Sequence, residues 1–169
     1  MAAREIGRLA GALWLVLFGA VTAAPGFAAE GGPAAKVPRF ASLRSDEVNL
    51  RVGPGRNYPI EWVLTKKGLP VEIIAQFEHW RKIREPQGSE GWVQERMLTA
   101  QRAAMITGAT RDLHRAPDAA SATLARVEPG VIASLLECRG EWCRISVGRV
   151  TGWVRRSDIF GVLPDETVR

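Results

Sequence analysis

Two cysteines and two histidines are the side chains of this chain with the most reactive chemistry. Cys138 and Cys143 flank Arg139 and Gly140, a predicted hairpin turn. In an exported protein such a pair usually oxidises, and the chain-entropy gain from so small a loop is about 2 kcal/mol. The alternative is a redox-active pair, but the spacing is not Cys-x-x-Cys, and no helix start is available to lower a thiol pKa. We therefore predict a structural disulfide.

The histidines do not indicate catalysis. His79 falls in a predicted hairpin turn, and His114 follows Leu113 in a predicted strand. Neither belongs to a spacing typical of a metal site, and no nucleophile with a neighbouring base is evident. We expect no catalytic residue, no metal and no cofactor, so we predict that the chain is not an enzyme.

An internal repeat organises the other conspicuous residues. Its shared positions are separated by 63 residues at the start and 61 at the end, as short loop deletions would leave. In the first copy they are Leu50, Pro54, Gly68, Trp80, Gly91, Trp92 and Val93, and in the second Leu113, Pro117, Gly130, Trp142, Gly152, Trp153 and Val154. The paired tryptophans are expected to be core or half-buried, since burying one covers about 150 to 250 Å². Stacking on a sugar or peptide is the alternative.

The positions that differ between the copies suggest a binding surface. Tyr58 is replaced by Ser121, Trp62 by Ala125 and Arg51 by His114. Exposed Tyr, Trp and Arg are the residues that most often anchor interfaces, so the first copy is predicted to bind and the second to support. The candidate ligand-binding residues are Arg51, Asn57, Tyr58, Trp62, Trp80 and Trp92. Alternatively, Tyr58 and Trp62 pack on the N-terminal leader or on the second copy.

The elements that carry these residues are predicted to be short strands. Apolar runs alternate with Gly, Pro or Asn about every ten residues, which is typical of a small all-β barrel. For example, Val48, Leu50 and Val52 alternate with polar neighbours and are followed by the turn at Gly53-Pro54-Gly55. We expect four or five strands per copy.

The N-terminal 28 residues are predicted to be a secretory signal peptide. Two arginines precede a largely apolar run at 9–22, and Gly26-Phe27-Ala28 offers small residues for cleavage. An uncleaved anchor is the alternative, but this run is shorter than the roughly 20 residues that span a bilayer. Residues 29–40 are expected to form a flexible leader. After cleavage we expect no stable membrane anchor.

The charge pattern argues against a nucleic-acid partner. The formal net charge is +5, with basic residues interspersed among acidic ones. Blocks of like charge that would form a nucleic-acid arm are absent from the sequence.

The motifs of the first copy resemble those of the bacterial SH3-like (SH3b) domain of exported proteins. They are Val48-Asn49-Leu50-Arg51-Val52-Gly53-Pro54-Gly55, then Tyr58, Lys67-Gly68, Trp80 and Gly91-Trp92-Val93. The likeness covers 41–99, and a degenerate second copy covers 104–162. It implies an all-β fold of two tandem small SH3-like β-barrels and a non-catalytic role in the cell envelope.

Two functions remain open for a periplasmic or secreted protein of this kind. The first is recognition of cell-wall (peptidoglycan) material through the first copy. The second is a protein-interaction adaptor whose first copy binds an extended peptide or an envelope enzyme. The adaptor would have no affinity for bare wall polymer.

Overall fold

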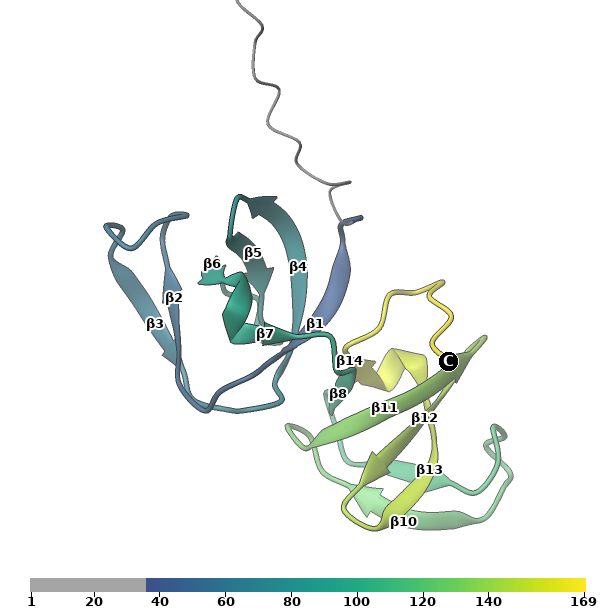
Figure 1. The fold of residues 1–169 in the computed structure, drawn as a ribbon. Helices are drawn as coiled ribbons and strands as arrows, with labels where there is room; N and C mark the ends of the chain where they lie inside the picture. Colours follow the sequence, from purple (N-terminus) through teal and green to yellow (C-terminus); the bar gives the residue numbers. More distant parts are fainter. Residues whose placement is uncertain (1–35) are drawn as a thin grey trace, which may run out of the picture. The chain divides into compact units, whose positions relative to one another are not determined.

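The computed structural model describes residues 36–169, which consist almost entirely of β-strands and turns (Figure 1). The first repeat forms a seven-stranded antiparallel sheet in the order β3-β2-β6-β5-β4-β1-β7. Its strands are β1 (Arg39–Leu43), β2 (Val48–Arg51), β3 (Ile60–Leu64), β4 (Pro70–Phe77), β5 (Trp80–Arg84), β6 (Glu90–Gln94) and β7 (Leu98–Thr99). A 3-10 turn, η1 (Glu95–Met97), joins β6 to β7.

The second repeat builds a sheet of the same order, β10-β9-β13-β12-β11-β8-β14. Its strands are β8 (Ala103–Ile106), β9 (Arg111–His114), β10 (Thr123–Val127), β11 (Ile132–Arg139), β12 (Trp142–Val147), β13 (Val150–Arg155) and β14 (Ile159–Phe160). The turn η2 (Arg156–Asp158) takes the place of η1. Each sheet curls around a core of its own, so the predicted pair of small β-barrels is confirmed.

Alternation along the strands separates each core from the outer face. In β2, Val48 and Leu50 are buried while Asn49 is exposed, as predicted. The expectation for Val52 was wrong: β2 ends at Arg51, and Val52 is 53% exposed at the start of the following turn. In β6, Gly91 and Val93 face inward and Trp92 and Gln94 are half-buried.

The expected number of strands, four or five per repeat, was too low. The outermost strands β3 and β10 were missed because their apolar and polar residues do not alternate cleanly. The two-residue strands β7 and β14 are too short to give any pattern. Strand β1 starts at Arg39, inside the stretch expected to be leader and two residues before the expected domain start at 41.

The N-terminal predictions concern a different part of the chain. The predicted signal peptide, 1–28, and the leader up to residue 35 lie outside the described residues. Within 36–169, the structure contains no helix that is long and apolar enough to cross a membrane.

Candidate functional site

A groove of about 390 Å³ lies on the outer face of the first barrel, over β2, β5 and β6. Trp80 is paired in register with Gln94, and Arg51 with Trp92, so these side chains share one face of the sheet. The lining residues are Glu47, Asn49, Arg51, Arg56, Trp80, Gln94, Arg96 and Met97. A second hollow, of about 550 Å³, shares four of them, Arg56, Trp80, Gln94 and Arg96. We call the two hollows together the Trp80 groove.

The side chain of Arg51 braces the loop beside the groove. Its Nη1 donates to the carbonyl oxygens of Arg56 (3.2 Å) and Tyr58 (2.6 Å). In the second barrel His114 makes the corresponding hydrogen bond. Its Nδ1 lies 3.0 Å from the carbonyl oxygen of Ser121, and because a carbonyl oxygen can only accept, Nδ1 is the donor. The exchange of Arg51 for His114 therefore preserves one hydrogen bond across the loop.

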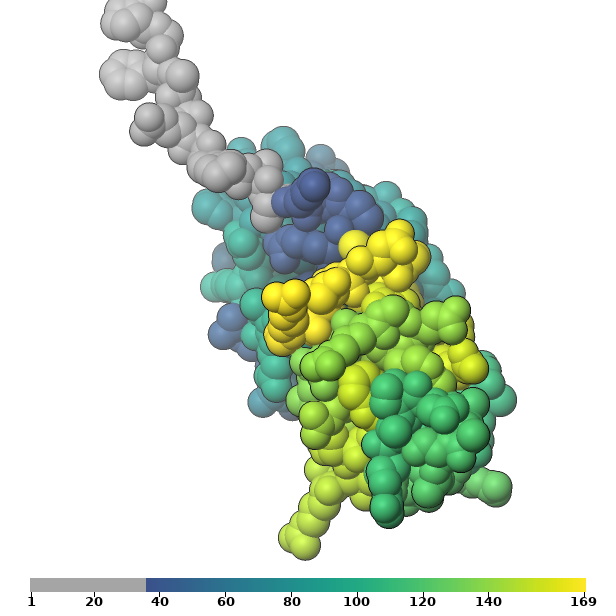
Figure 2. Space-filling model, turned by 90° about the vertical axis from the view of Figure 1, so that its right-hand side faces the viewer, coloured from purple at the N-terminus to yellow at the C-terminus, as the bar shows by residue number. Residues whose placement is uncertain are grey.

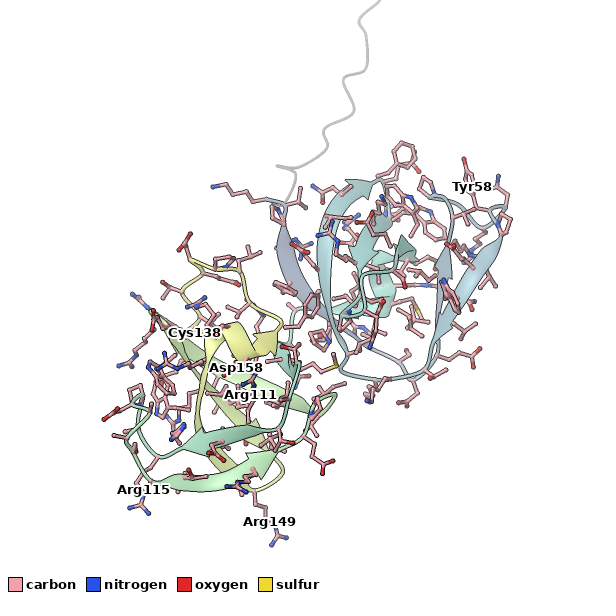
Figure 3. The ribbon with its side chains drawn as sticks, turned by 180° about the vertical axis from the view of Figure 1, so that it is seen from behind. Tyr58, Arg111, Arg115, Cys138, Arg149 and Asp158 are labelled. Atoms are coloured by element: carbon pink, nitrogen blue, oxygen red, sulfur yellow. A yellow bond between two sulfur atoms is a disulfide. The ribbon has the colours of Figure 1, made fainter. Side chains whose placement is uncertain are left out.

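Tyr58 lies on the glycines of its own turn. A Cβ built at Gly53 would be 2.4 Å from Cδ1 of the Tyr58 ring, and one at Gly55 would be 3.1 Å from Cδ2. The ring packs against bare backbone and still keeps 41% of the side chain exposed, at the outer loop labelled in Figure 3. The contact between the Tyr58 ring and the glycines of its own turn was not among the contacts considered from the sequence, which were with the leader or the second copy.

The second barrel holds its corresponding loop differently. Gly53, Gly55 and Tyr58 become Ala116, Asp118 and Ser121, and the hydroxyl of Ser121 accepts from the amide of Ala116 at 3.0 Å. The tyrosine and the two glycines are thus replaced together, by a hydrogen-bonded turn. Loss of Tyr58 from the second copy has a structural explanation.

A groove of about 430 Å³ occupies the corresponding place on the second barrel, and Trp142 corresponds there to Trp80. It is lined by Thr110, Arg111, Asp112, His114, Ala119, Arg126, Trp142, Arg155 and Asp158. The guanidinium carbon of Arg155 lies 4.9 Å from the Trp142 ring centroid, and the His114 ring meets that tryptophan edge-on at 5.7 Å. The Trp142 ring in this groove is therefore covered by Arg155 and contacted by His114.

Comparison with known proteins identifies the fold family. The family model described as "Bacterial SH3 domain" matches residues 44–99 and 109–161. The chain belongs to the bacterial SH3 domain family.

The relatives of these SH3 domains include a much longer protein. The candidate N-acetylmuramoyl-L-alanine amidase YrvJ of Bacillus subtilis (strain 168) is 29% identical over 125 residues. The match covers 68% of this chain and 24% of the relative's own length.

Three solved structures show weak likeness. NlpC2 from Trichomonas vaginalis is 13% identical with a TM-score of 0.35, covering 73% of this chain and 48% of that one. NlpC1 from the same organism is 11% identical with a TM-score of 0.35, covering 76% and 47%. An NlpC/P60 family protein from Bacillus cereus is 16% identical with a TM-score of 0.33, covering 72% and 55%. Likeness at this level has no bearing on function.

The first SH3 domain brings only some of the predicted site residues together. Arg51 and Trp80 line the Trp80 groove, and Trp92 lies beside Arg51 on the neighbouring strand. Asn57 and Tyr58 belong to the loop that Arg51 braces. Trp62 lies on the outermost strand β3, opposite Leu50, and is 58% exposed. The groove does not include Asn57, Tyr58, Trp62 or Trp92.

Several groove residues were missed from the sequence. Asn49 and Gln94 could have been found by counting two positions from Arg51 and Trp92 along their strands. Arg56 lies in the loop and Arg96 in η1, where no periodicity places a side chain. The missed lining residues are Glu47, Asn49, Arg56, His79, Gln94, Glu95, Arg96 and Met97.

A cluster of charges occupies the other end of the same face of the first SH3 domain. Glu90 accepts from Lys82 at 2.7 Å and from Arg84 at 2.8 Å, and Arg84 also pairs with Glu72 at 3.0 Å. Hydrogen bonds from Lys82 and then Arg84 hold the pKa of Glu90 below its ordinary value of 4.5. The Glu90 bond is the main cause that raises the pKa of Arg84. These cations already have partners.

The second SH3 domain contains the predicted disulfide, which joins Cys138 to Cys143 and is confirmed. Both cysteines are fully buried in the core. The C-terminal segment covers them, because Val168 forms a bridge to Cys138 and the amide of Cys138 donates to its carbonyl at 3.0 Å. Figure 2 shows this segment, in yellow, running over the surface of the domain.

Metal-ligating side chains are dispersed in the region that the structure describes. Between residues 36 and 169 there is no group of three or more His, Cys, Asp or Glu that could hold a metal ion.

Proposed function

We propose that this chain is a non-catalytic binding module of the cell envelope, located in the periplasm or secreted, which holds cell-wall (peptidoglycan) material in the Trp80 groove. One observation carries the proposal. Trp80 forms part of the wall of an open groove, and among residues 36–169 its ring has no stacked ring or cation, whereas Trp142 is covered by Arg155. An uncovered indole is a suitable platform for a sugar ring or a peptide.

The family and the relative support wall material as the ligand. The name of YrvJ refers to N-acetylmuramoyl-L-alanine, which is a unit of peptidoglycan. This chain matches 24% of that relative's length.

The test is co-sedimentation of purified protein with purified sacculi. Trp80→Ala is expected to weaken binding by about tenfold or more, as for a central aromatic anchor. Trp142→Ala is the matched control, because it removes the same side chain from the corresponding place on the other barrel, and it should leave binding unchanged. Circular dichroism melts establish that both variants are folded.

Two results would contradict the proposal. Wild-type protein that stays in the supernatant would exclude wall binding, and release of soluble muropeptides from the pellet would exclude a non-catalytic role.

The second candidate function, a protein-interaction adaptor, is favoured by strand β3, whose unpaired edge carries exposed Ile60, Trp62 and Val63. An adaptor would leave bare sacculi unbound.

A further inference from the structure

The charges of the two grooves differ in a way that the sequence does not reveal. The Trp80 groove is lined by three arginines, Arg51, Arg56 and Arg96, with Glu47 as the acid of its main hollow. None of the three forms an ion pair in the described part of the chain. The adjoining hollow adds His79 and Glu95, and Glu95 already pairs with Arg81 at 2.7 Å.

The groove of the second barrel serves as an internal comparison, and its arginines are paired with acids. Its three arginines each face a carboxylate: Arg111 with Asp158 at 3.3 Å, Arg126 with Asp112 at 3.2 Å and Arg155 with Glu141 at 3.2 Å. Figure 3 labels the first of these pairs, Arg111 and Asp158.

The unpaired arginines are missing at the matching positions of the second copy. Arg51, Arg56 and Arg96 correspond to His114, Ala119 and Ser157. One fold and one tryptophan position thus carry two charge arrangements. Each arginine of the second groove has a carboxylate partner, Asp158 and Asp112 from the groove lining and Glu141 from outside it. The first groove keeps positive charge available to a ligand.

Within the first groove, Arg56 and Arg96 have the most freedom to bind. Nη1 of Arg51 is committed to two backbone carbonyls, which fixes the loop that carries Arg56. The side chains of Arg56 and Arg96 are exposed, and neither forms a hydrogen bond or ion pair within 36–169. A guanidinium presents a planar fork of donors that matches a carboxylate in two-point contact.

We propose that the Trp80 groove recognises free carboxylate groups on the peptides of the wall polymer, with Arg56 and Arg96 as the carboxylate-binding residues and Trp80 as the surface on which the adjoining chain rests. This inference rests on the proposed function and adds the chemical group that is bound. The neutral sugars of the glycan would not use the arginines, whereas an anionic peptide end uses both features of the groove. The second barrel, with its arginines paired, does not share this specificity.

The experiment compares two forms of the same polymer. Purified sacculi are divided, and in one portion the carboxyl groups are converted to neutral amides with a water-soluble carbodiimide and an amine. Wild-type protein is expected to bind the amidated portion about tenfold more weakly, as for loss of a charge-assisted contact of about 1.4 kcal/mol. The double variant Arg56→Ala, Arg96→Ser, which installs the residues of the second copy, should lose a similar factor on untreated sacculi. On the amidated portion, the double variant should bind about as weakly as the wild-type protein does.

A charge-matched control separates the groove from general attraction. Arg115 and Arg149 are exposed arginines of the second barrel without ion pairs in the described residues (Figure 3). Arg115→Ala, Arg149→Ser removes the same charge and should bind untreated sacculi like the wild type. An equal loss in both double variants would overturn the assignment to the groove.

The remaining outcomes distinguish failure of carboxylate recognition from failure of the proposed wall binding. Equal binding of wild-type protein to both forms of sacculi would overturn carboxylate recognition and leave wall binding intact. Binding that survives amidation but is abolished by polyphosphate would also overturn it, in favour of a phosphate polymer. Failure to bind either form would remove the proposed function together with this inference.

Discussion

At the scale of single residues, one glycine in each barrel allows two neighbouring strands to approach closely, β6 and β2 in the first barrel and β13 and β9 in the second. A Cβ at Gly152 would lie 2.7 Å from the carbonyl oxygen of His114 and 2.7 Å from Cγ of Leu113. A Cβ at Gly91 would meet Cγ of Leu50 at 2.5 Å and the carbonyl oxygen of Arg51 at 3.0 Å. The glycine of each Gly-Trp-Val motif therefore serves the close approach of the strand that carries Arg51 or His114.

Replacing Gly152 with alanine is expected to lower the free energy of unfolding by about 2 to 3 kcal/mol, the cost of overpacking against a fixed strand. Gly140→Ala is the control, because nothing lies within 4 Å of its Cβ position and the cost there, from its positive φ, is about 1 kcal/mol. Urea denaturation measures both. A smaller loss for Gly152 than for Gly140 would show that the strands can separate without penalty.

Residue types alone suggested which positions differ between the copies, but not what the differences do. Tyr58, Arg51 and their counterparts were interpreted as a binding surface, and the structure adds contacts within their own loops. The reason is that the loop after β2 brings the carbonyl of Tyr58, seven positions along the chain, back to Arg51. Sequence spacing outside regular strands does not predict such contacts. Arg51 was identified because the two copies differ there, and Trp80 because its tryptophan recurs in both copies.

At the scale of elements, the β11–β12 hairpin is bridged by a C-terminal residue, Val168, that no sequence pattern predicts. The disulfide was predicted because Cys138 and Cys143 flank a turn and because such a pair usually oxidises in an exported protein. Val168, which pairs with Cys138 and is buried, lies in a polar C-terminal segment without alternation. Val168 belongs to the buried core of the second barrel, and such long-range packing is not visible in a local sequence pattern.

The disulfide is expected to resist reduction in the folded protein, because both cysteines are buried beneath Val168 and a reductant must wait for local opening. A thiol assay on denatured, unreduced protein should find no free thiol. Val168→Asp places a carboxylate in an apolar site and should speed reduction by about tenfold or more, since 1.4 kcal/mol of easier opening has that effect. Thr167→Ala, at the exposed neighbour, is the control, and equal reduction rates for the two variants would show that the segment does not protect the bond.

At the scale of the whole molecule, the repeat predicts two barrels because its Gly, Pro and Trp positions recur in order. The strand order is repeated as well, since both sheets have the same order. The electrostatic difference between the grooves could not be predicted. Each barrel has many arginines, and which of them meet a carboxylate depends on side chains from separate strands and turns, such as Arg111 of β9 and Asp158 of η2.

Acid should destabilise the protein through carboxylates that are bound in the folded state. Burial alone would raise the pKa of Glu166, but hydrogen bonds from Arg102 and from the amide of Leu163 outweigh it, and the pKa is lower than the ordinary 4.5. The pKa of Glu90 is lowered as well. The unfolded chain therefore binds more protons than the folded one at low pH. The stabilisation is complete well above pH 4.5 and is lost as the pH falls through the lowered folded values.

Thermal melts between pH 7 and pH 3 test this directly. Wild-type protein should keep its midpoint down to about pH 5 and then lose stability. Glu166→Gln should melt a few degrees lower at pH 7, because Arg102 loses its ion pair, and should lose less on acidification, because the titrating group is gone. Glu128→Gln is the control, since Glu128 is exposed and has no ion pair within residues 36–169, and it should follow the wild type. If Glu166→Gln lost as much stability between pH 5 and pH 3 as the wild type, the carboxylate at the C-terminal segment would have no part in acid unfolding.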